Sequence, residues 1–156
     1  MSEETGTAQA PVIRGLREGD RAEWEQLYAG YAAFYKVEQT PEMRATVWGW
    51  IFDPGHTTEA LVAAADNGTL LGLAHFRPFA RPLSATTGGF LDDLFVDPDA
   101  RGLGVADALL DAVADEGRKR GWSVIRWITA DDNYRARAVY DRKAVKTHWL
   151  TYDIRL

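Results

Sequence analysis

Apolar side chains recur along the first fifty residues with the three-to-four-residue spacing of helices. Residues 20–35 carry such a stripe of large apolar and aromatic side chains, and Asp20 is a suitable N-cap. A second helix is predicted to begin at Pro41, since proline is tolerated in a first turn, and to run to about Ile51. Residues 12–17 before them form a predicted strand.

The pattern then changes to short apolar runs that are rich in β-branched and aromatic residues. Residues 60–65 and 69–79 flank Asp66-Asn67-Gly68, a sequence typical of a hairpin turn. Residues 86–96 form the next predicted strand. This part of the chain therefore predicts three consecutive antiparallel strands.

Helical spacing returns over residues 104–120, which end on a basic turn followed by Gly121, as expected for a helix C-terminus. A strand over 122–129, a helix from about residue 131 to 143, and one or two strands over 146–156 are predicted to follow. The order of elements predicts an α/β (α+β) fold, a mixed sheet flanked by helices.

Composition narrows the class of protein. The 156 residues are 46% hydrophobic and 26% charged, which is typical of a globular chain, and there are no cysteines, which suits a cytoplasmic location. We interpret residues 1–11 as a disordered lead-in and residues 12–156 as a single domain. No apolar run is long enough for a membrane span.

Charge and histidine spacing argue against a nucleic-acid partner and against a metal site. The net charge of −5 disfavours nucleic acid as a partner and favours a cationic small substrate. His56, His75 and His148 lack the spacing of paired metal ligands, so no metal site is predicted. On its strand, His75 is interpreted as a structural histidine.

The chemistry is concentrated where the strand over residues 86–96 runs through a glycine loop into the next helix. The first amides of a helix have no intrahelical acceptor, and the helix dipole adds positive charge there. Gly102 and Gly104 let a ligand approach the backbone closely, and Arg101 adds a cation. The loop is therefore predicted to bind a pyrophosphate. Its spacing fits neither a Walker loop nor a dinucleotide-binding fingerprint.

Two motifs resemble those of the GNAT superfamily of N-acetyltransferases. One is Leu94-x-Val96-x-Pro98-x-x-Arg101-Gly102-x-Gly104-x-Ala106, and the other is Asn133-x-x-Ala136-x-x-x-Tyr140. The resemblance covers residues 12–156 and implies the GNAT fold, a mostly antiparallel sheet with two splayed central parallel strands. The sequence around Asp92 and the tail that contains Trp149 look closest to the polyamine and yeast-type histone/polyamine branch.

The sequence departs from the family pattern at two places. Residues 141–145 replace the usual Gly-Phe turn after Tyr140, so the family pattern does not define where the last helix ends. Asp92 stands where the polyamine branch has glutamate, one methylene longer, which favours a water relay over direct proton abstraction.

The resemblance implies acetyl-CoA as co-substrate and assigns residues to it. Leu94, Phe95 and Val96 would pair with the pantetheine arm, and Asn133 would contact that arm. An amide of the same strand would stabilise the oxyanion of the attacked thioester. The pyrophosphate would be held by Arg101, Gly102, Leu103, Gly104, Val105 and Ala106.

Catalytic roles follow from the same resemblance. Tyr140 is the candidate general acid for the leaving thiolate. Adjacent strand residues point to opposite faces, so only one of Asp92 and Asp93 is expected to face the cleft. The family match makes Asp92 the preferred base. Asp93 would then contact the acceptor or support the sheet. The alternatives Glu38, Glu42 and Glu59 are left unranked.

Aromatic residues of the first two helices have two interpretations. Tyr31, Tyr35 and Trp48 would either line an acceptor site for an amine or simply pack in the core. The predicted function is transfer of acetyl to a primary amine by direct attack, with a small cationic amine or polyamine favoured. Protein or histone lysines, a protein N-terminus, and a non-catalytic acyl-CoA sensor are the alternatives. A homodimer through the terminal strands is a further expectation.

Overall fold

The molecule is built on one five-stranded sheet with the order β1-β2-β3-β4-β5. The computed structural model describes residues 10–156, so most of the predicted lead-in lies outside the described residues. Every strand pair is antiparallel except β4–β5, which is parallel, and the predicted mixed sheet is thereby confirmed. The strands are β1 (Val12–Gly15), β2 (Glu59–Ala64), β3 (Leu70–Arg81), β4 (Thr86–Val96) and β5 (Ile125–Arg126).

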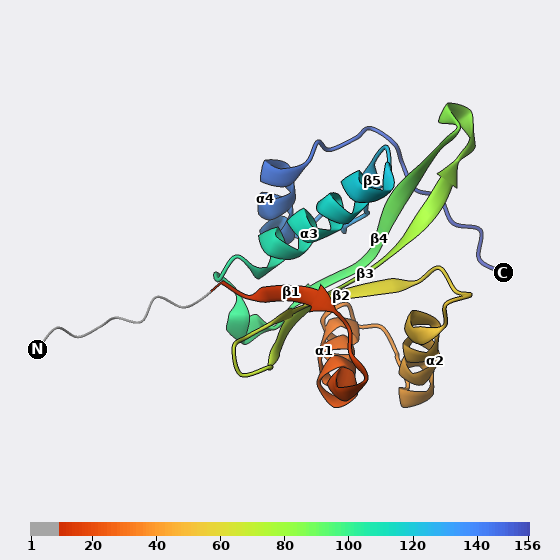
Figure 1. Cartoon of the computed structure of the whole chain (residues 1–156). Helices are drawn as coiled ribbons and strands as arrows, with labels where there is room; N and C mark the ends of the chain where they lie inside the picture. The colour runs from red at the N-terminus through yellow and green to blue at the C-terminus, as the bar shows by residue number, and fades with distance from the viewer. Residues whose placement is uncertain (1–9) are drawn as a thin grey trace, which may run out of the picture.

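Helices cover both faces of this sheet (Figure 1). On one face lie α1 (Arg21–Phe34) and α2 (Pro41–Phe52), and on the other lie α3 (Val105–Arg120) and α4 (Tyr134–Lys143). Thr40 caps α2, because its hydroxyl accepts from the amide of Met43 at 3.2 Å. Asp20 occupies the N-cap position of α1 but does not cap with its side chain, which instead pairs with Arg14 at 2.7 Å.

Each face of the sheet has its own apolar cluster. Trp24 and Leu27 of α1 pack with Leu73 of β3 and Phe95 of β4 on the α1–α2 face. The cluster on the α3–α4 face is formed by residues of β2, β3, β4 and α3, chiefly Ala63, Ala74, Phe76, Leu91, Val105, Leu109, Leu110 and Val113. The cluster to which a strand residue belongs therefore shows on which face of the sheet its side chain lies.

Two predicted strands differ in the structure. The strand predicted over residues 122–129 is reduced to Ile125–Arg126, because β5 pairs with β4 only at Gly89 and Phe90 before the two strands separate. The strands predicted over 146–156 are absent from the described residues, and this segment is an exposed arm that runs away from α4 (Figure 1). A β-prone sequence forms a strand only where a neighbour completes its hydrogen bonds.

The separation of β4 from β5 sets the position of the site. From Leu91 to Val96, β4 is hydrogen-bonded to β3 along one edge, while no described strand pairs with its other edge. The candidate functional residues therefore lie on and around the unpaired edge of β4, close to the start of α3.

Candidate active site

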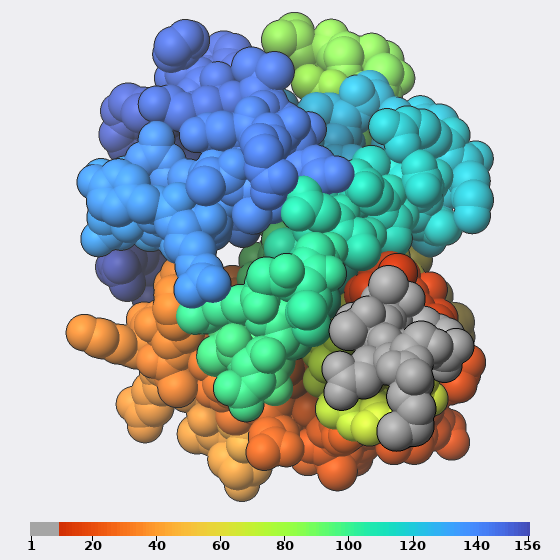
Figure 2. Space-filling model, turned by 90° about the vertical axis from the view of Figure 1, so that its left-hand side faces the viewer, coloured from red at the N-terminus to blue at the C-terminus, as the bar shows by residue number. Residues whose placement is uncertain are grey.

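A cavity of about 650 Å³ opens beside the free edge of β4. Figure 2 shows this side of the molecule, where the end of α1, the loop before α3 and the segment containing α4 surround a hollow. Its lining includes Phe34, Tyr35, Leu94, Phe95, Val96, Arg101, Gly102, Gly104, Val105, Ala106, Asp107, Asn133, Arg135, Val139, Tyr140 and Arg142. Most residues predicted to hold acetyl-CoA are therefore gathered at one cavity.

The glycine loop has a backbone that only glycine adopts readily. Gly102 and Gly104 have φ values of 83° and 74°, in the left-handed region, and a Cβ added at either would meet nothing within 4 Å. No described residue accepts a hydrogen bond from the amides of Val105 and Ala106 in the first turn of α3. An open concave turn with free amides at a helix N-terminus fits a diphosphate.

Cations flank this turn. The Arg101 guanidinium lies 5.7 Å from the centre of the Phe34 ring, which places it at the rim between α1 and α3. Arg142 of α4 also lines the cavity and lies 3.5 Å from Asp107. Both can add charge-assisted hydrogen bonds to an anion in the turn.

The backbone of Leu94, Phe95 and Val96 forms the wall of the cavity that continues the sheet. One edge of these residues pairs with Ala74, Leu73 and Gly72 of β3. The other edge faces the cavity, where an extended ligand arm can hydrogen-bond as an added strand.

Tyr140 projects from α4 into the same cavity. Its ring packs edge-on against Trp127 with centroids 5.3 Å apart, which fixes the direction of the phenol. Burial, with a smaller effect of Tyr35, raises the pKa of Tyr140 to about 12, so the phenol stays protonated at neutral pH. A protonated phenol in this cavity has the chemistry of a proton donor.

Asn133 joins the two walls of the cavity. Its side-chain oxygen accepts from the amide of Ala136 at 3.4 Å and so caps α4, and its amide nitrogen donates to the Tyr35 hydroxyl at 3.2 Å. Tyr35, predicted as an acceptor residue, thus lies with Phe34 on the cavity beside β4, together with the residues predicted to hold acetyl-CoA.

A β-bulge at Asp92 overturns the expectation that Asp92 and Asp93 point to opposite faces. His75 pairs with Asp93 and Phe76 pairs with Leu91, so Asp92 is an extra residue in β4. Leu91 and Leu94 both pack in the cluster on the α3–α4 face. Asp93 instead contacts His75, which Trp24 of α1 contacts in turn. Asp92 contacts Arg77, two residues beyond His75 on the same face of β3, so both aspartates lie on the α1–α2 face. Alternation fails because the bulge interrupts the pleat.

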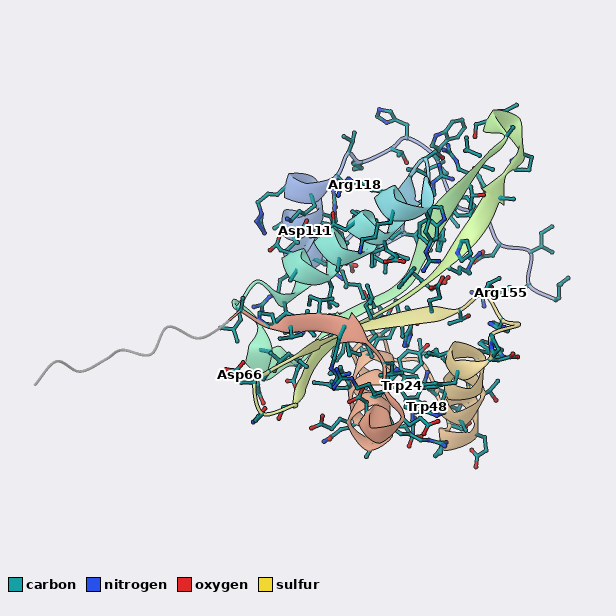
Figure 3. The ribbon with its side chains drawn as sticks, in the orientation of Figure 1. Trp24, Trp48, Asp66, Asp111, Arg118 and Arg155 are labelled. Atoms are coloured by element: carbon teal, nitrogen blue, oxygen red, sulfur yellow. The ribbon has the colours of Figure 1, made fainter. Side chains whose placement is uncertain are left out.

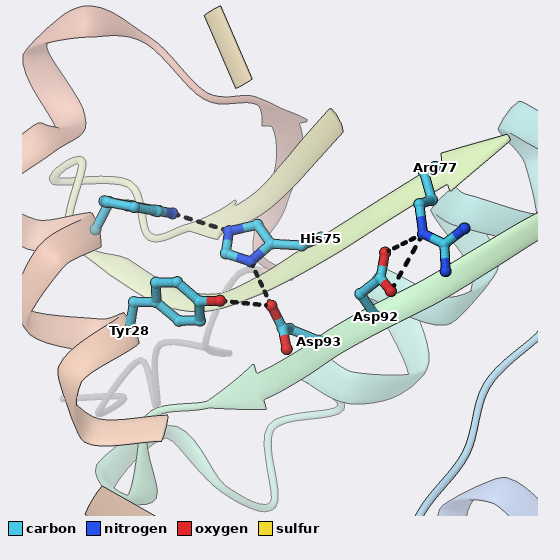
Figure 4. Close-up of polar contacts among 6 residues, drawn as sticks. Tyr28, His75, Arg77, Asp92 and Asp93 are labelled. Atoms are coloured by element: carbon cyan, nitrogen blue, oxygen red, sulfur yellow. Dashed lines mark hydrogen bonds and ion pairs between the residues drawn. The ribbon is translucent and has the colours of Figure 1, made fainter. Parts of the chain in front are cut away.

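Asp93 is held by a buried hydrogen-bond network (Figure 4). His75 Nδ1 and the Tyr28 hydroxyl lie 2.8 Å and 2.9 Å from the same Asp93 oxygen, and Trp24 donates to His75 Nε2 at 3.0 Å. Burial by itself would raise the pKa of the Asp93 carboxyl, but the hydrogen bonds from His75, Tyr28 and Tyr31 outweigh it, and the pKa lies below its ordinary value.

Asp92 has a different environment. Arg77 Nε lies 3.1 Å from Asp92 Oδ2 (Figure 4). The Arg77 guanidinium also stacks on the Phe90 ring, 4.9 Å from its centre. Burial raises the pKa of the Asp92 carboxyl, and the ion pair with Arg77 offsets this only in part. The bulge thus presents two carboxylates of unequal acidity.

The two remaining residues predicted to bind the acceptor, Tyr31 and Trp48, lie in different surroundings. Tyr31 packs on Phe95 at 5.7 Å, beside the Asp93 network. Trp48 packs on Trp24 at 5.3 Å between α1 and α2, which supports the core interpretation (Figure 3).

Sequence reasoning did not identify Trp24, Tyr28 and Arg77 as parts of the site. The helical spacing of Trp24 and Tyr28 placed them on one stripe, and Arg77 follows His75 by two positions on the same face of a strand. Both spacings can be seen in the sequence, but neither of them indicates which residue of β4 these side chains contact.

Residues 10–156 contain neither a metal site nor a membrane-spanning helix. No cluster of three or more histidine and carboxylate side chains with metal-binding geometry occurs there. No helix in the same range combines the length and apolar character needed to cross a bilayer.

Comparison with known proteins places the chain among acetyltransferases. The family model described as "Acetyltransferase (GNAT) family" matches residues 22–144. A D-amino-acid N-acetyltransferase of Saccharomyces cerevisiae is 27% identical over 142 residues, which cover 90% of this chain and 88% of that protein. An aminoglycoside N(6′)-acetyltransferase type 1 of Stenotrophomonas maltophilia is 31% identical over 119 residues, covering 73% of this chain and 72% of that protein.

Solved structures of acetyltransferases superimpose on this chain. A ribosomal-protein-alanine N-acetyltransferase from Brucella melitensis biovar Abortus 2308 superimposes with a TM-score of 0.79 and 29% identity, covering 95% of this chain and all of that one. An aminoglycoside N-acetyltransferase in complex with CoA has the same fold, with a TM-score of 0.80 over 97% of this chain and 98% of that one at 19% identity.

Proposed function

This chain belongs to the GNAT acetyltransferase family and is an acetyl-CoA-dependent N-acetyltransferase, and we propose that it acetylates a small primary amine bound on the α1–α2 face of β4. The observation that carries the proposal is the bulge at Asp92. It brings two carboxylates onto one face of the strand that lines the acetyl-CoA cavity.

The placement of acid and carboxylates supports transfer between two substrates that approach from opposite faces. Tyr140 packs in the cluster on the α3–α4 face, while Asp92 and Asp93 lie on the α1–α2 face. The free edge of β4 lies between them. An amine held by the carboxylates can therefore reach the reacting carbon through the gap beside this edge.

Acetyl-CoA, when bound, supplies an acyl carbon activated as a thioester. Leu94, Phe95, Val96 and Asn133 are proposed to hold its pantetheine arm, and Arg101 with the backbone of residues 102–106 its diphosphate.

The chain's own groups can move the protons that this transfer requires. Alkylammonium groups are mostly protonated at neutral pH, so one proton must leave before the nitrogen attacks. Asp93, with its low pKa, binds the ammonium, and Asp92, with its higher pKa, accepts the proton through a water. Tyr140 gives its proton to the departing thiolate, and the second proton, which leaves the nitrogen as the amide forms, restores the phenol. The chain has no cysteine, which supports direct attack.

Two acceptor classes follow from the charges around Asp92. Paired carboxylates favour a small cationic amine or polyamine, whereas the Arg77 guanidinium beside them favours an amine that also carries a carboxylate. The yeast relative is named for activity on D-amino acids. Protein lysines and N-termini are a third class.

An acceptor screen tests the proposal. Thiol release from acetyl-CoA is measured with spermidine, a D-amino acid, the amide of that amino acid, and a lysine peptide. We expect the highest kcat/KM with a small amine. Turnover confined to the lysine peptide would contradict a small acceptor, and a preference for the D-amino acid over its amide would identify Arg77 as a carboxylate-binding group.

We also propose that the chain forms a homodimer through the arm, defined as residues 146–156. Trp149, Leu150, Tyr152 and Ile154 in the arm are more than three-quarters exposed, and apolar residues occupy alternate positions as in an edge strand. Ile128 beside the unpaired edge of β5 is also exposed. Light scattering on the full chain should give a dimer mass, and a chain truncated after Val145 should give a monomer mass. A full chain that is monomeric at high concentration contradicts this.

A further inference from the structure

His75 is almost fully buried, with 1% of its surface exposed, and yet both of its ring nitrogens have a single defined partner. Trp24 Nε1 lies 3.0 Å from Nε2, and Asp93 Oδ2 lies 2.8 Å from Nδ1. An indole N–H can only donate, so Nε2 must accept. Nδ1 therefore carries the proton and donates it in a hydrogen bond to Asp93.

The same contacts fix the direction of the Asp93 carboxylate. His75 and Asp93 are directly paired across β3 and β4, and the Tyr28 hydroxyl donates to the same oxygen as His75. The Tyr28 ring packs edge-on against the His75 ring with centroids 4.7 Å apart. Two donors from two elements leave the carboxylate little rotational freedom.

The network runs from the interior toward the acceptor face. Trp24 is 0% exposed and His75 1%, whereas the Asp93 side chain is 18% exposed. A buried imidazole N–H needs an acceptor in any role, but the acceptor here is a partly exposed carboxylate at the proposed acceptor face and not a group of the core. A chain of oriented donors that ends on such a carboxylate is the arrangement by which a substrate contact is held in place.

We propose that His75 is a positioning residue for the acceptor amine: Trp24 fixes it as the Nδ1–H tautomer, and in that form it aims the Asp93 carboxylate at the substrate nitrogen. This inference rests on the proposed role of Asp93 as the group that binds the ammonium. His75 itself touches neither substrate and transfers no proton.

Two substitutions separate positioning from packing. His75→Asn keeps an amide N–H close to the place of Nδ1–H, whereas His75→Phe keeps a ring of similar volume and removes the donor. We expect His75→Phe to raise KM for the amine by about 10–100-fold, the same size as the loss on removing a group that orients a metal ligand. KM for acetyl-CoA should stay within about twofold, since the cavity residues are untouched. His75→Asn should restore most of the affinity for the amine.

Matched controls keep the test decisive. His56→Phe changes a histidine that stacks on Trp50 away from the site, and it should alter neither KM. Thermal unfolding of each variant identifies any that fail to fold. If His75→Phe misfolds, the tautomer is read from the ring ¹⁵N shifts of the unmodified chain, where Nδ1 protonated is the expected result and Nε2 protonated overturns the proposal.

The outcomes also separate this inference from the proposed function. If Asp93→Asn leaves KM for the amine unchanged, the role of Asp93 is wrong and the inference falls with it. If Asp93→Asn raises KM while His75→Phe does not, only the positioning role is overturned. Equal rises in both KM values for His75→Phe, without rescue by His75→Asn, would indicate a purely structural histidine.

Discussion

Arg77 Nε lies 3.1 Å from Asp92 Oδ2, so one of the two carboxylates at the bulge of β4 already has a fixed cation as its partner. Asp93 has neutral hydrogen-bond donors instead. The two aspartates therefore differ in how much negative charge each can offer an incoming ammonium group.

This difference predicts that substitutions of Asp92 and of Asp93 change different kinetic constants. Asp93→Asn should raise KM for the amine by about 10-fold or more, because removing one partner of a charge-assisted hydrogen bond costs about 1.5–3 kcal/mol. Asp92→Asn should chiefly lower kcat, since its proposed task is to accept a proton. Steady-state kinetics with the best acceptor measure both. A pattern in which Asp92→Asn raises KM and Asp93→Asn does not would reverse the assignment.

Tyr140→Phe should lower kcat by about 100-fold, at the low end of the range for general acid catalysis, and leave CoA affinity unchanged. Tyr134→Phe is the matched control, because Tyr134 lies on the same helix and is 73% exposed. Since the pKa of Tyr140 is raised to about 12, the phenol keeps its proton at the alkaline end of an assay, and kcat should show no decline from its ionisation up to about pH 11. A decline that sets in near pH 9 and is absent from Tyr140→Phe would contradict this.

Gly104→Trp should abolish CoA binding. At φ 74° any side chain is strained, and a Trp side chain there would extend into the cavity. Gly121→Trp carries the same strain, at φ 73°, at the end of α3 and away from the cavity. Calorimetric titration with CoA should show binding to the second variant and none to the first. Loss of binding in both would mean that strain, not occupation of the turn, was measured.

Trp24→Phe tests the hydrogen bond to His75 through stability. Removing the indole N–H leaves the buried Nε2 of His75 without a donor, which costs about 1–3 kcal/mol in the free energy of unfolding, in addition to lost packing. Trp50→Phe, at a residue that is 43% exposed, should change the free energy by less than about 0.5 kcal/mol. Urea unfolding of the three proteins gives the comparison, and equal stability of all three would show that the hydrogen bond contributes nothing.

The Arg14–Asp20 pair makes stability depend on acid pH. The hydrogen bond from Arg14 is the main reason that the pKa of Asp20 lies below its ordinary value, although burial opposes it. A lowered folded-state pKa contributes stability above the unfolded value and loses it as pH falls through the folded value. The melting temperature of Asp20→Asn should thus lie below that of the unmodified chain at pH 7 and approach it below about pH 4. A constant difference from pH 7 to pH 2 would refute this linkage.

Much of the fold could be predicted because its signals are local. The stripe in α1, the turn at Asp66-Asn67-Gly68 and the basic end of α3 each follow from the residues of one segment. The strands over 122–129 and 146–156 could not be predicted correctly, because β propensity says nothing of whether a neighbouring strand is present.

The sequence by itself determined the order of the elements, the glycine turn before α3 and the family motifs, since spacing along the chain and the conformational freedom of glycine are properties of adjacent residues. Only the tertiary structure decided that Asp92 and Asp93 share a face, that Arg77 neutralises one of them, and that Trp24 fixes the His75 that holds the other. Those facts depend on the register between β3 and β4 and on the packing of α1 across them, and contacts between residues up to 51 positions apart leave no trace in the local pattern.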